Sequence, residues 1–420
     1  GIYLISSITI SKQCLLQGSG MFSGGTYILA KNAASNVFNC TGSSITIRDM
    51  FFDKNTTQTG GSYILAGAAS SKLLIENIYM LNWYVGVNIT GISDFSLRHM
   101  RINNGVAATG TAVRITSGLL VNLYDVTVDS AGGGSAPGSG LTITNCGDVT
   151  LESCSFIHCV NGATFQPGAS QTVTSVNATN CFFDNNTSYG LLLQPTSVSG
   201  TVQRSRFANC WFASSGVSGV LLDTTTTAGT IDGIEFVDPE IYLNASTGFN
   251  ATGSNTKRTK IFGGRIAQNT GAGVLFGAGV SNWQVIGATI GTVAGLTGNT
   301  TYGIQSSAGT SDDILILGNQ LTGNTTSALL ISSTGSRRRI ADNIGYNPIA
   351  PTAITVTGSP FTYTAGDSPE FITVNSGTVS LVTIDGLASY QAAPCGFSLG
   401  PGKSAVVTYT VLPSMNKFPM

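Results

Sequence analysis

One pattern of apolar positions recurs along most of the chain: apolar, any residue, apolar, two variable residues, apolar, any residue, apolar. Ile45, Ile47, Met50 and Phe52 form a clear copy. Alternation with a period of two predicts short strands that bury one side. The second apolar position of each copy gives twelve anchors, which lie 22 to 31 residues apart: Ile47, Ile75, Leu97, Leu123, Leu151, Ala178, Phe207, Phe236, Ile261, Val285, Ile316 and Ile340.

A second motif lies between these copies and consists of a small residue followed by apolar, any residue, apolar. Clear examples are segments 86–89, 140–143, 190–193, 219–222 and 273–276. Each repeat therefore holds about three short strands. Stacking such repeats at the interstrand spacing of about 4.8 Å gives a right-handed parallel β-helix. A β-propeller is excluded because its blades need about 40 residues or more.

The two variable residues inside the first motif predict a corner between two strands. Asn, Asp and Gly, which tolerate the left-handed backbone region, dominate the second of these positions. A structural corner also accounts for the acidic residues and for His99 in this column, without a catalytic role. The column reads Asp49, Asn77, His99, Asp125, Ser153, Asn180, Asn209, Asp238, Gly263, Gly287, Gly318 and Asp342.

The position after the corner is predicted to point inward. In three successive repeats it is Cys154, Cys181 and Cys210. Three aligned thiols suggest a metal site, but no His or further Cys in this column completes a tetrahedral set. We therefore predict a packed core of cysteines, because free Cys is among the most buried residue types. No metal site and no cofactor are expected.

The repeat stops near residue 350. Beyond it, short strand-like segments alternate with tight turns over about 70 residues. The chain is therefore predicted to be all-β, with a right-handed parallel β-helix over 1–350 and a β-sandwich-like module over 351–420. The expected role of this module is trimerisation or carbohydrate binding.

Composition narrows the function classes. Charged residues make up 9% of the chain, with 19 basic and 20 acidic side chains and a net charge of −1. Binding of nucleic acid or of a membrane surface needs clustered Lys and Arg, so neither is expected. No apolar run reaches the roughly 20 residues of a spanning helix, so no membrane insertion is expected and the chain is predicted to be soluble.

Two outward columns carry the candidate chemistry. In the last strand of the motif, one column is predicted to run Thr127, Ser155, Phe182, Trp211, Glu240 and Arg265, and its neighbour Asp129, Ile157, Asp184, Ala213 and Tyr242. This register exposes three aromatic rings beside acidic side chains, which suits stacking of pyranose rings. The predicted substrate-binding residues are Phe182, Trp211, Tyr242 and Arg265.

Asp129 and Asp184 are the first candidates for catalysis. They lie two repeats apart, roughly 10 Å at the backbone, so their carboxyl groups approach the range of about 6.5 to 9.5 Å of inverting glycosidases. His158 projects between them, and Glu240 lies in the adjoining column. The alternative is that the aromatic rings pack against another protomer and the acids only solvate the surface. Two further charged columns, Arg48, Glu76, Arg98 and Arg206, Glu235, Lys260, are predicted to be surface ion-pair ladders.

Segments at both ends carry a family resemblance. Residues 1–5 (GIYLI) and 16–20 (LQGSG) resemble the first rung of the pectate-lyase-like β-helix of bacteriophage and prophage tailspike or tail fibre proteins. Segments 345–348 (GYNP), 359–364 (SPFTYT), 376–379 (SGTV), 401–402 (PG) and 407–409 (VTY) are similar to C-terminal modules of such proteins.

This resemblance implies a homotrimer on a virion that binds, and commonly cleaves, a bacterial surface polysaccharide, either capsule or O-antigen, outside the host cell. It also implies attachment to a phage tail or baseplate through an N-terminal region that this sequence lacks. The Arg-x-Pro-x-x-Arg motif of pectate lyases is missing, as is the Asn-Thr-Asp, Asp-Asp and Gly-His-Gly set of polygalacturonases, apart from Asp312 and Asp313, for which a corner role is expected.

Three functions therefore stay open. The first is a depolymerase, either a hydrolase or a lyase, and a lyase would use Tyr124, His158 and Arg101. The second is a receptor-binding or structural tail spike without enzymatic activity. The third is a secreted adhesin of the same fold.

Overall fold

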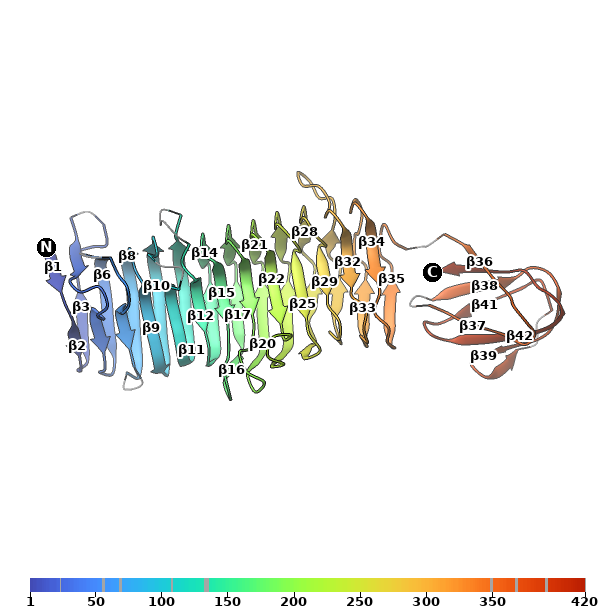
Figure 1. Ribbon diagram of the computed structural model, residues 1–420, viewed down its shortest axis with the longest axis horizontal. Coiled ribbons are helices and arrows are strands. Elements are labelled where there is room, and N and C mark those ends of the chain that lie inside the picture. The colour runs from blue at the N-terminus through green and yellow to red at the C-terminus, as the bar shows by residue number, and fades with distance from the viewer. Residues whose placement is uncertain are drawn as a thin grey trace.

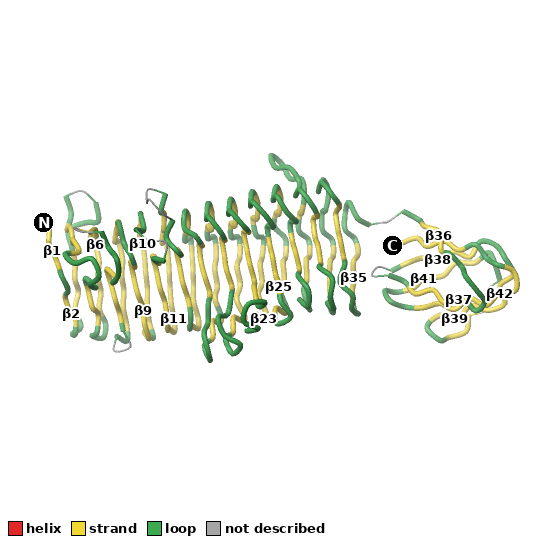
Figure 2. The backbone as a smooth tube through the Cα atoms, in the orientation of Figure 1, coloured by secondary structure: helices red, strands yellow, loops and turns green. Residues whose placement is uncertain are grey.

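The computed structural model describes residues 1–22, 24–54, 57–67, 70–106, 109–131, 136–347, 350–366, 369–389 and 392–419. Within these ranges every regular element is a strand and none is a helix (Figure 2). The described chain accordingly offers no helix with the length and apolar character that crossing a membrane requires.

A single coiled sheet of 35 strands forms the long part of the molecule (Figure 1). Its strands pair in parallel, each with the strand one repeat earlier or later, and they form three faces. Face 1 precedes the predicted corner, face 2 follows it, and face 3 carries the second motif. The long strand β11 (Thr111–Asp129) contributes to all three faces, because it pairs with strands on each of them. The predicted right-handed parallel β-helix of about twelve turns is confirmed.

The strand bounds follow the three faces. Strands β6 (Ile45–Lys54), β8 (Lys72–Leu81) and β10 (Asp94–Asn103) run through the corner from face 1 to face 2. Face 1 also contains, or is entered by, β3 (Cys14–Gln17), β13 (Cys146–Glu152), β16 (Thr172–Thr174), β17 (Val176–Thr179), β20 (Thr201–Ala208), β23 (Thr230–Val237), β26 (Thr256–Lys257), β27 (Lys260–Phe262), β30 (Gln284–Ile286), β33 (Ile314–Leu317) and β35 (Arg338–Ala341).

The other two faces are built from shorter strands. Face 2 contains β1 (Ile2–Ile5), β4 (Thr26–Ala30), β14 (Ser155–Ile157), β18 (Phe182–Asp184), β21 (Trp211–Ala213), β24 (Glu240–Tyr242), β28 (Arg265–Ala267) and β31 (Thr289–Ile290). Face 3 contains β2 (Ile8–Ile10), β5 (Phe38–Cys40), β7 (Ser62–Ala66), β9 (Val85–Ile92), β12 (Ser139–Ile143), β15 (Asn161–Phe165), β19 (Tyr189–Leu193), β22 (Ser218–Asp223), β25 (Phe249–Thr252), β29 (Val274–Phe276), β32 (Tyr302–Ser306) and β34 (Ser327–Ile331).

The corner between faces 1 and 2 has the predicted backbone conformation. All twelve corner residues have positive φ, between 47° at Asp238 and 68° at Gly287. This left-handed conformation turns the chain within two residues, and Asn, Asp and Gly adopt it at the least cost. His99, with φ 52°, is one of these corner residues. Asp313 also has positive φ, in agreement with its predicted corner role.

Side chains that point inward stack between rungs. Cys154, Cys181 and Cys210 are fully buried and free, so the predicted cysteine core is confirmed. The Cys154 thiol donates to the backbone carbonyl of Leu123 at 3.4 Å. Aromatic rings stack in the same way, and the centroids of Phe183 and Phe212 lie 5.1 Å apart with nearly parallel planes. These stacks stabilise the narrow core through close-packed dispersion contacts and through the burial of apolar surface.

A ladder of asparagines was not predicted. It lies on the turn between faces 2 and 3, where the side-chain amide of each member donates to the amide oxygen of the next. The distances are 2.9 Å from Asn244 to Asn269, 2.8 Å from Asn269 to Asn299 and 2.9 Å from Asn299 to Asn324. The ladder satisfies backbone groups that a turn would otherwise leave unpaired in a buried place.

The C-terminal segment forms two antiparallel sheets, which run β36-β43-β38-β41 and β37-β42-β39-β40. A common apolar cluster with contributions from both sheets includes Ile372, Val382 and Val407. The predicted β-sandwich-like arrangement is therefore present, while a domain boundary at residue 350 stays a prediction. The strand bounds are β36 (Thr352–Ile354), β37 (Phe361–Thr364), β38 (Glu370–Val374), β39 (Thr378–Ile384), β40 (Leu387–Ser389), β41 (Cys395–Leu399), β42 (Ser404–Val411) and β43 (Met415–Pro419).

Candidate functional site

The outer surface of face 2 carries the two predicted columns in the predicted register. Phe182 pairs with Trp211, Trp211 with Glu240, and Glu240 with Arg265. In the adjoining column, Asp129 pairs with Ile157 and Ala213 with Tyr242. The one exception to outward exposure is Ala213, which is buried. The structure thus places the predicted aromatic and charged residues on one face.

Three aromatic rings form a continuous cluster on this face. The ring centroids of Phe182 and Trp211 lie 5.7 Å apart, and those of Trp211 and Tyr242 lie 4.8 Å apart. Phe182 is 45% exposed, which is high for a large apolar side chain. Burial, together with the charges of Glu240 and Asp184, raises the pKa of Tyr242 to about 12. The Tyr242 hydroxyl therefore stays protonated at neutral pH and remains a hydrogen-bond donor.

Asp129 and His158 form a hydrogen-bonded pair at the end of face 2. The distance from His158 Nδ1 to Asp129 Oδ1 is 2.8 Å, and the same oxygen accepts the backbone N–H of Ala131 at 3.0 Å. His158 has a left-handed backbone, with φ 55°, and its side chain contacts Asp129 in the previous rung. Both side chains keep a little over a third of their surface exposed. The pair is oriented and open to solvent.

Asp184 lies further along the same column. Its Oδ1 accepts the backbone N–H of Asn185 at 2.8 Å, and its Oδ2 accepts the Asn185 side-chain amide at 3.0 Å. The register places Asp184 two rungs from Asp129, because Ser155, in the rung after that of Asp129, pairs with Phe182. Two rungs correspond to roughly 10 Å at the backbone. The two carboxylates thus border one stretch of the face.

Glu240 and Arg265 are paired with each other. Arg265 Nε lies 2.8 Å from Glu240 Oε1 and 2.9 Å from Oε2. The hydrogen bond and the charge of Glu240 raise the pKa of Arg265 above its ordinary value. Glu240 was predicted as a catalytic candidate and Arg265 as a substrate-binding residue. In the structure they form an ion pair at the edge of the aromatic cluster.

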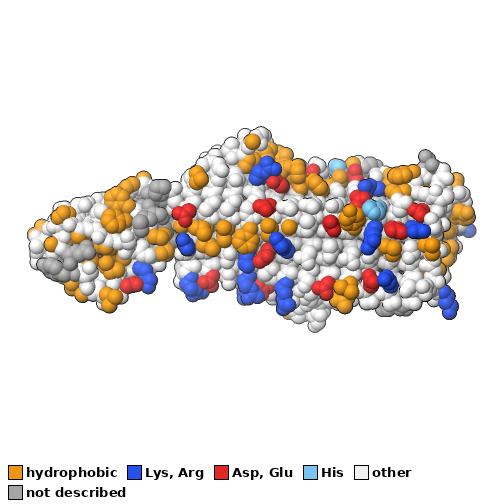
Figure 3. Space-filling view, turned by 180° about the vertical axis from the view of Figure 1, so that it is seen from behind, with side chains coloured by type: hydrophobic (Ala, Val, Ile, Leu, Met, Phe, Trp, Pro, Cys, Tyr) orange, Lys and Arg blue, Asp and Glu red, His pale blue; other side chains and the backbone are white. Residues whose placement is uncertain are grey.

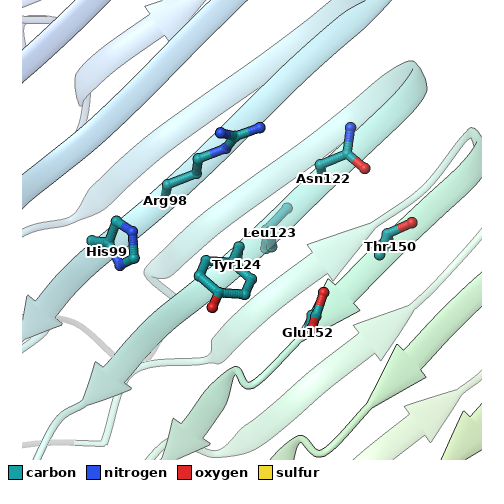
Figure 4. A pocket seen from close by; sticks show the side chains of 7 residues that line it. All are labelled: Arg98, His99, Asn122, Leu123, Tyr124, Thr150 and Glu152. Atoms are coloured by element: carbon teal, nitrogen blue, oxygen red, sulfur yellow. The ribbon is translucent and has the colours of Figure 1, made fainter.

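Sequence reasoning missed a groove on face 1. It has a volume of about 330 Å³ and lies over strands β10, β11 and β13 (Figure 4). Its lining residues are Arg98, His99, Asn122, Leu123, Tyr124, Thr150 and Glu152. The sequence does hold a signal for it. Long side chains in one outward column, Arg98, Tyr124 and Glu152, lie beside short ones, Asn122 and Thr150, in the next column.

Tyr124 stands in the middle of the groove (Figure 4) and is 42% exposed. The His99 ring lies perpendicular to the Tyr124 ring, with centroids 5.4 Å apart and an interplanar angle of 90°. His99 Nδ1 in turn lies 3.0 Å from Asp125 Oδ2, while Arg101 lies 3.1 Å from Asp125 Oδ1. Burial alone would raise the pKa of Asp125, but hydrogen bonds from His99 and Arg101 outweigh it and lower the pKa below the ordinary value.

The predicted ion-pair ladders are only partly formed. Arg48 pairs with Glu76 at 3.4 Å, and Lys260 with Glu235 at 3.0 Å. The prediction is wrong for Arg98 and Arg206, which form no ion pair with any residue that the structure describes. The three lyase candidates are not brought together. Tyr124 lies on face 1 and Arg101 contacts Asp125 at the corner, whereas His158 contacts Asp129, where that strand of face 2 ends.

Over the described ranges, His, Cys, Asp and Glu side chains form no cluster of three or more that is suited to a metal ion. Face 2 and the groove on face 1 present aromatic rings, carboxylates and guanidinium groups. Groups of these kinds are typical of sites for hydroxyl-rich organic ligands.

Comparisons with known proteins agree with this architecture. Residues 26–197 match the family described as the right handed beta helix region. No curated protein matches the chain.

Solved structures that resemble the chain share little sequence with it. The A-module of mannuronan C-5 epimerase AlgE4 from Azotobacter vinelandii is 17% identical, with 80% of this chain and 89% of that chain covered and a TM-score of 0.48. The Dettilon tailspike protein is 10% identical, with coverage of 99% and 87% and a TM-score of 0.46. The catalytic domain of a GH87 alpha-1,3-glucanase is 13% identical, with coverage of 82% and 63% and a TM-score of 0.46. The family match over residues 26–197 supports the right-handed β-helix that the strand register shows.

Proposed function

We propose that the chain binds a polysaccharide along face 2 of the β-helix. The observation that carries this proposal is the row of three aromatic rings, Phe182, Trp211 and Tyr242, on successive rungs of an outer surface. Aromatic rings offer flat apolar faces, and a sugar ring stacks its C–H face on such a surface. A row of rings along the axis of the β-helix suits an extended chain of sugar residues better than an isolated small molecule.

The surroundings of the aromatic row support a polar, hydroxyl-rich ligand. Asp184, Glu240 and Arg265 flank the rings, and the Tyr242 hydroxyl stays protonated. A protein interface core is normally depleted of such charged side chains. Carboxylates and guanidinium groups beside aromatic rings instead form hydrogen bonds to sugar hydroxyls, while the rings provide apolar contact area for the sugar ring.

We further propose that the bound polysaccharide is cleaved by hydrolysis between Asp129 and Asp184. His158 and the Ala131 N–H hold the Asp129 carboxylate in one orientation, which suits a general base that takes a proton from the attacking water. The water oxygen bonds to the anomeric carbon as the glycosidic C–O bond breaks, and Asp184, which has to enter this step in its protonated form, gives its proton to the leaving glycosidic oxygen. The two residues are two rungs apart, roughly 10 Å at the backbone. We propose that their carboxyl groups fall within the range of about 6.5 to 9.5 Å that leaves room for the water and gives inversion at the anomeric carbon.

The biological setting that we propose is a phage tailspike that acts outside the cell on a capsule or O-antigen. The terminal segments that resemble tailspike and tail fibre proteins support this setting. The proposed units are a β-helix over 1–350 and a C-terminal module over 351–420 that serves trimerisation or carbohydrate binding.

An apolar column on face 1 supports the proposed homotrimer. Figure 3 shows a row of hydrophobic side chains along the half of the β-helix nearer the C-terminal sheets. Pairing in register aligns Ala208, Val237, Phe262, Ile286 and Leu317, all partly exposed, in one outward column. Light scattering should give a trimeric mass, and Phe262→Asp should shift the protein toward monomers.

The test of polysaccharide binding and cleavage uses capsular and O-antigen polysaccharides from a panel of bacterial strains. Binding, polymer size and new reducing ends are followed together. Trp211→Ala should weaken binding of the cognate polymer about tenfold, whereas Asp129→Asn and Asp184→Asn should retain binding and lose cleavage. A polymer that is shortened equally by both carboxylate variants would contradict the assigned roles.

A binding-only spike is the second candidate, and the existing contacts of the carboxylates favour it. Both oxygens of Asp184 accept hydrogen bonds from Asn185, and Glu240 is paired with Arg265. Binding without shortening, across a panel that contains the true receptor, would establish this function instead.

A further inference from the structure

We propose that the groove on face 1 is a separate binding site for an acidic sugar residue, with Arg98 as the partner of the sugar carboxylate. This inference rests on the proposed polysaccharide binding only for the class of ligand. The site itself stands on its own geometry, since it lies across the corner from the aromatic row on face 2.

The lining of the groove is a small array with defined register. Arg98, Tyr124 and Glu152 follow one another in one outward column, and Asn122 and Thr150 form the column beside it. Neighbouring rungs are about 4.8 Å apart, so this array spans the length of a sugar ring with its substituents. The volume of about 330 Å³ lies at the lower end of the range for small-molecule sites, about 300 to 1,000 Å³.

The polar groups of this array are free to bind a ligand. Arg98, Glu152, Asn122 and Thr150 make no side-chain hydrogen bond or ion pair with any residue in the described part of the chain. The contrast with the surroundings is sharp, because the neighbouring charges Arg48, Glu76, Arg101 and Asp125 are all paired. An open array of unpaired donors and acceptors around one exposed aromatic ring has the composition of a ligand site.

Arg98 sets the preference for an acidic sugar. Its guanidinium group is always charged and presents two parallel N–H donors that match a carboxylate. Figure 4 shows this side chain extending along the groove beside Tyr124, with Asn122 and Thr150 on the same side and Glu152 beyond. A uronate that stacks on Tyr124 would place its carboxylate at Arg98 and its hydroxyls at Glu152, Asn122 and Thr150.

A neighbouring ring supports Tyr124 from one side. The His99 ring lies perpendicular to the Tyr124 ring and is hydrogen-bonded to Asp125, which Arg101 also contacts. This contact restricts the rotamers of Tyr124, so less conformational entropy is lost on binding.

The test uses six-unit oligoglucuronate and oligogalacturonate, and the same oligomers after reduction of their carboxyl groups. Calorimetric titration of the full chain at low salt should show at least one acidic oligomer binding about tenfold more tightly than its reduced form. Raising the salt concentration should weaken only the acidic oligomer.

Variants identify the side chain that is responsible. Arg98→Gln should abolish the preference for the acidic oligomer, and Arg98→Lys should retain only part of it, because Lys lacks the planar fork. Arg339→Gln is the matched control, since Arg339 is an exposed arginine on face 1 far along the chain that lines no part of the groove. It should keep the full preference.

Two results would overturn the proposal: equal binding of acidic and reduced oligomers by the wild-type chain, or an unchanged preference in Arg98→Gln. Trp211→Ala separates this proposal from the binding proposed for face 2. It should weaken binding of the cognate polymer while the preference for acidic oligomers persists. If no polymer binds face 2 but the preference for acidic oligomers depends on Arg98, only the function proposed for face 2 fails.

Discussion

His158 Nδ1 lies 2.8 Å from Asp129 Oδ1, so a residue just after one strand of face 2 holds the carboxylate at the end of the strand one rung before it. The backbone of His158 is left-handed, with φ 55°. Its side chain and the Ala131 N–H both contact Oδ1 of Asp129 and thereby orient this carboxylate.

The Asp129→Asn substitution tests whether this orientation serves catalysis. It keeps the size of the side chain and removes the charge, so cleavage of the cognate polysaccharide should fall about a hundredfold or more while binding persists. Reducing-end assays and titration measure the two effects. Asp148→Asn is the matched control, because Asp148 is an exposed acid with positive φ at another corner, and Asn tolerates that conformation.

His158→Gln separates a positioning role from a catalytic one. Gln at this position still offers an amide donor to Asp129 but lacks the ring, so cleavage should be reduced less than in Asp129→Asn. A larger loss in His158→Gln than in Asp129→Asn would show that His158 itself takes part in proton transfer.

The asparagine ladder predicts a large stability effect from a single amide. Asn269 is fully buried, donates to Asn299 Oδ1 at 2.8 Å and accepts from Asn244 at 2.9 Å. Asn269→Ala leaves buried donors and acceptors on both neighbouring rungs unpaired, and should lower the free energy of unfolding by about 3 kcal/mol or more. Chemical denaturation measures the loss.

Two other asparagines provide the comparison. Asn177→Ala, at an exposed position on β17, should change the free energy of unfolding by less than about 0.5 kcal/mol. Asn324 is only partly buried and ends the ladder, so Asn324→Ala should fall between the two. A cost for Asn269→Ala as small as that for Asn177→Ala would show that water replaces the lost amide.

The fold could be predicted because each rung repeats two local constraints. Alternating apolar positions define the strands, and the corner requires a left-handed backbone that Asn, Asp and Gly accept most readily. These constraints act over a few residues, so one sequence displays them. Even Ser153 and His99, the less usual corner residues, have the predicted positive φ.

The asparagine ladder escaped prediction because its spacing is irregular. Asn244 and Asn269 each lie two residues after a strand of face 2, but Asn299 lies nine residues after the end of β31 at Ile290. The longer turn before Asn299 removes the regular spacing from the sequence. In the structure, the Asn299 side chain nevertheless lies between Asn269 and Asn324 and bonds with both. A ladder of this kind is visible only once the path of each turn is known.

The groove escaped prediction for a different reason. The sequence places Arg98 in a column with Glu76 and therefore favours an ion pair, but the carboxylate of Glu76 pairs with Arg48. The choice between two equally spaced partners depends on side-chain rotamers and not on register. The aromatic row on face 2, in contrast, follows from register alone and was predicted.

Asp223 predicts a loss of stability in acid. Burial raises the pKa of this carboxyl, but hydrogen bonds from Thr225 and Gln194 outweigh it and hold the pKa below the ordinary value of 3.8. A carboxyl with a lowered pKa in the folded state stabilises the protein at pH values above 3.8, and this contribution disappears as the pH falls through the folded-state value. The melting temperature should therefore decrease from pH 5 downward more steeply in the wild type than in Asp223→Asn.

The comparison of the two melting curves isolates this group, because Asp223→Asn keeps the shape of the side chain and cannot titrate. Curves that run parallel from pH 6 to below pH 3 would show that Asp223 has the same pKa in the folded and unfolded states.

The cysteines predict a two-step pattern of alkylation. Of the eight free cysteines, only Cys14 and Cys395 are not buried. Burial raises the pKa of Cys146 to about 12, and the same cause, with the nearby charge of Cys14 added, raises that of Cys40 to about 12. Alkylation needs access as well as a thiolate, so iodoacetamide at pH 8 should modify Cys14 and Cys395 in the native protein and the six buried cysteines, which are closed to solvent, only in denaturant. Peptide mass spectrometry reports each site, and rapid native modification of the stacked Cys181 would mean that the core opens far more often than a close-packed β-helix allows.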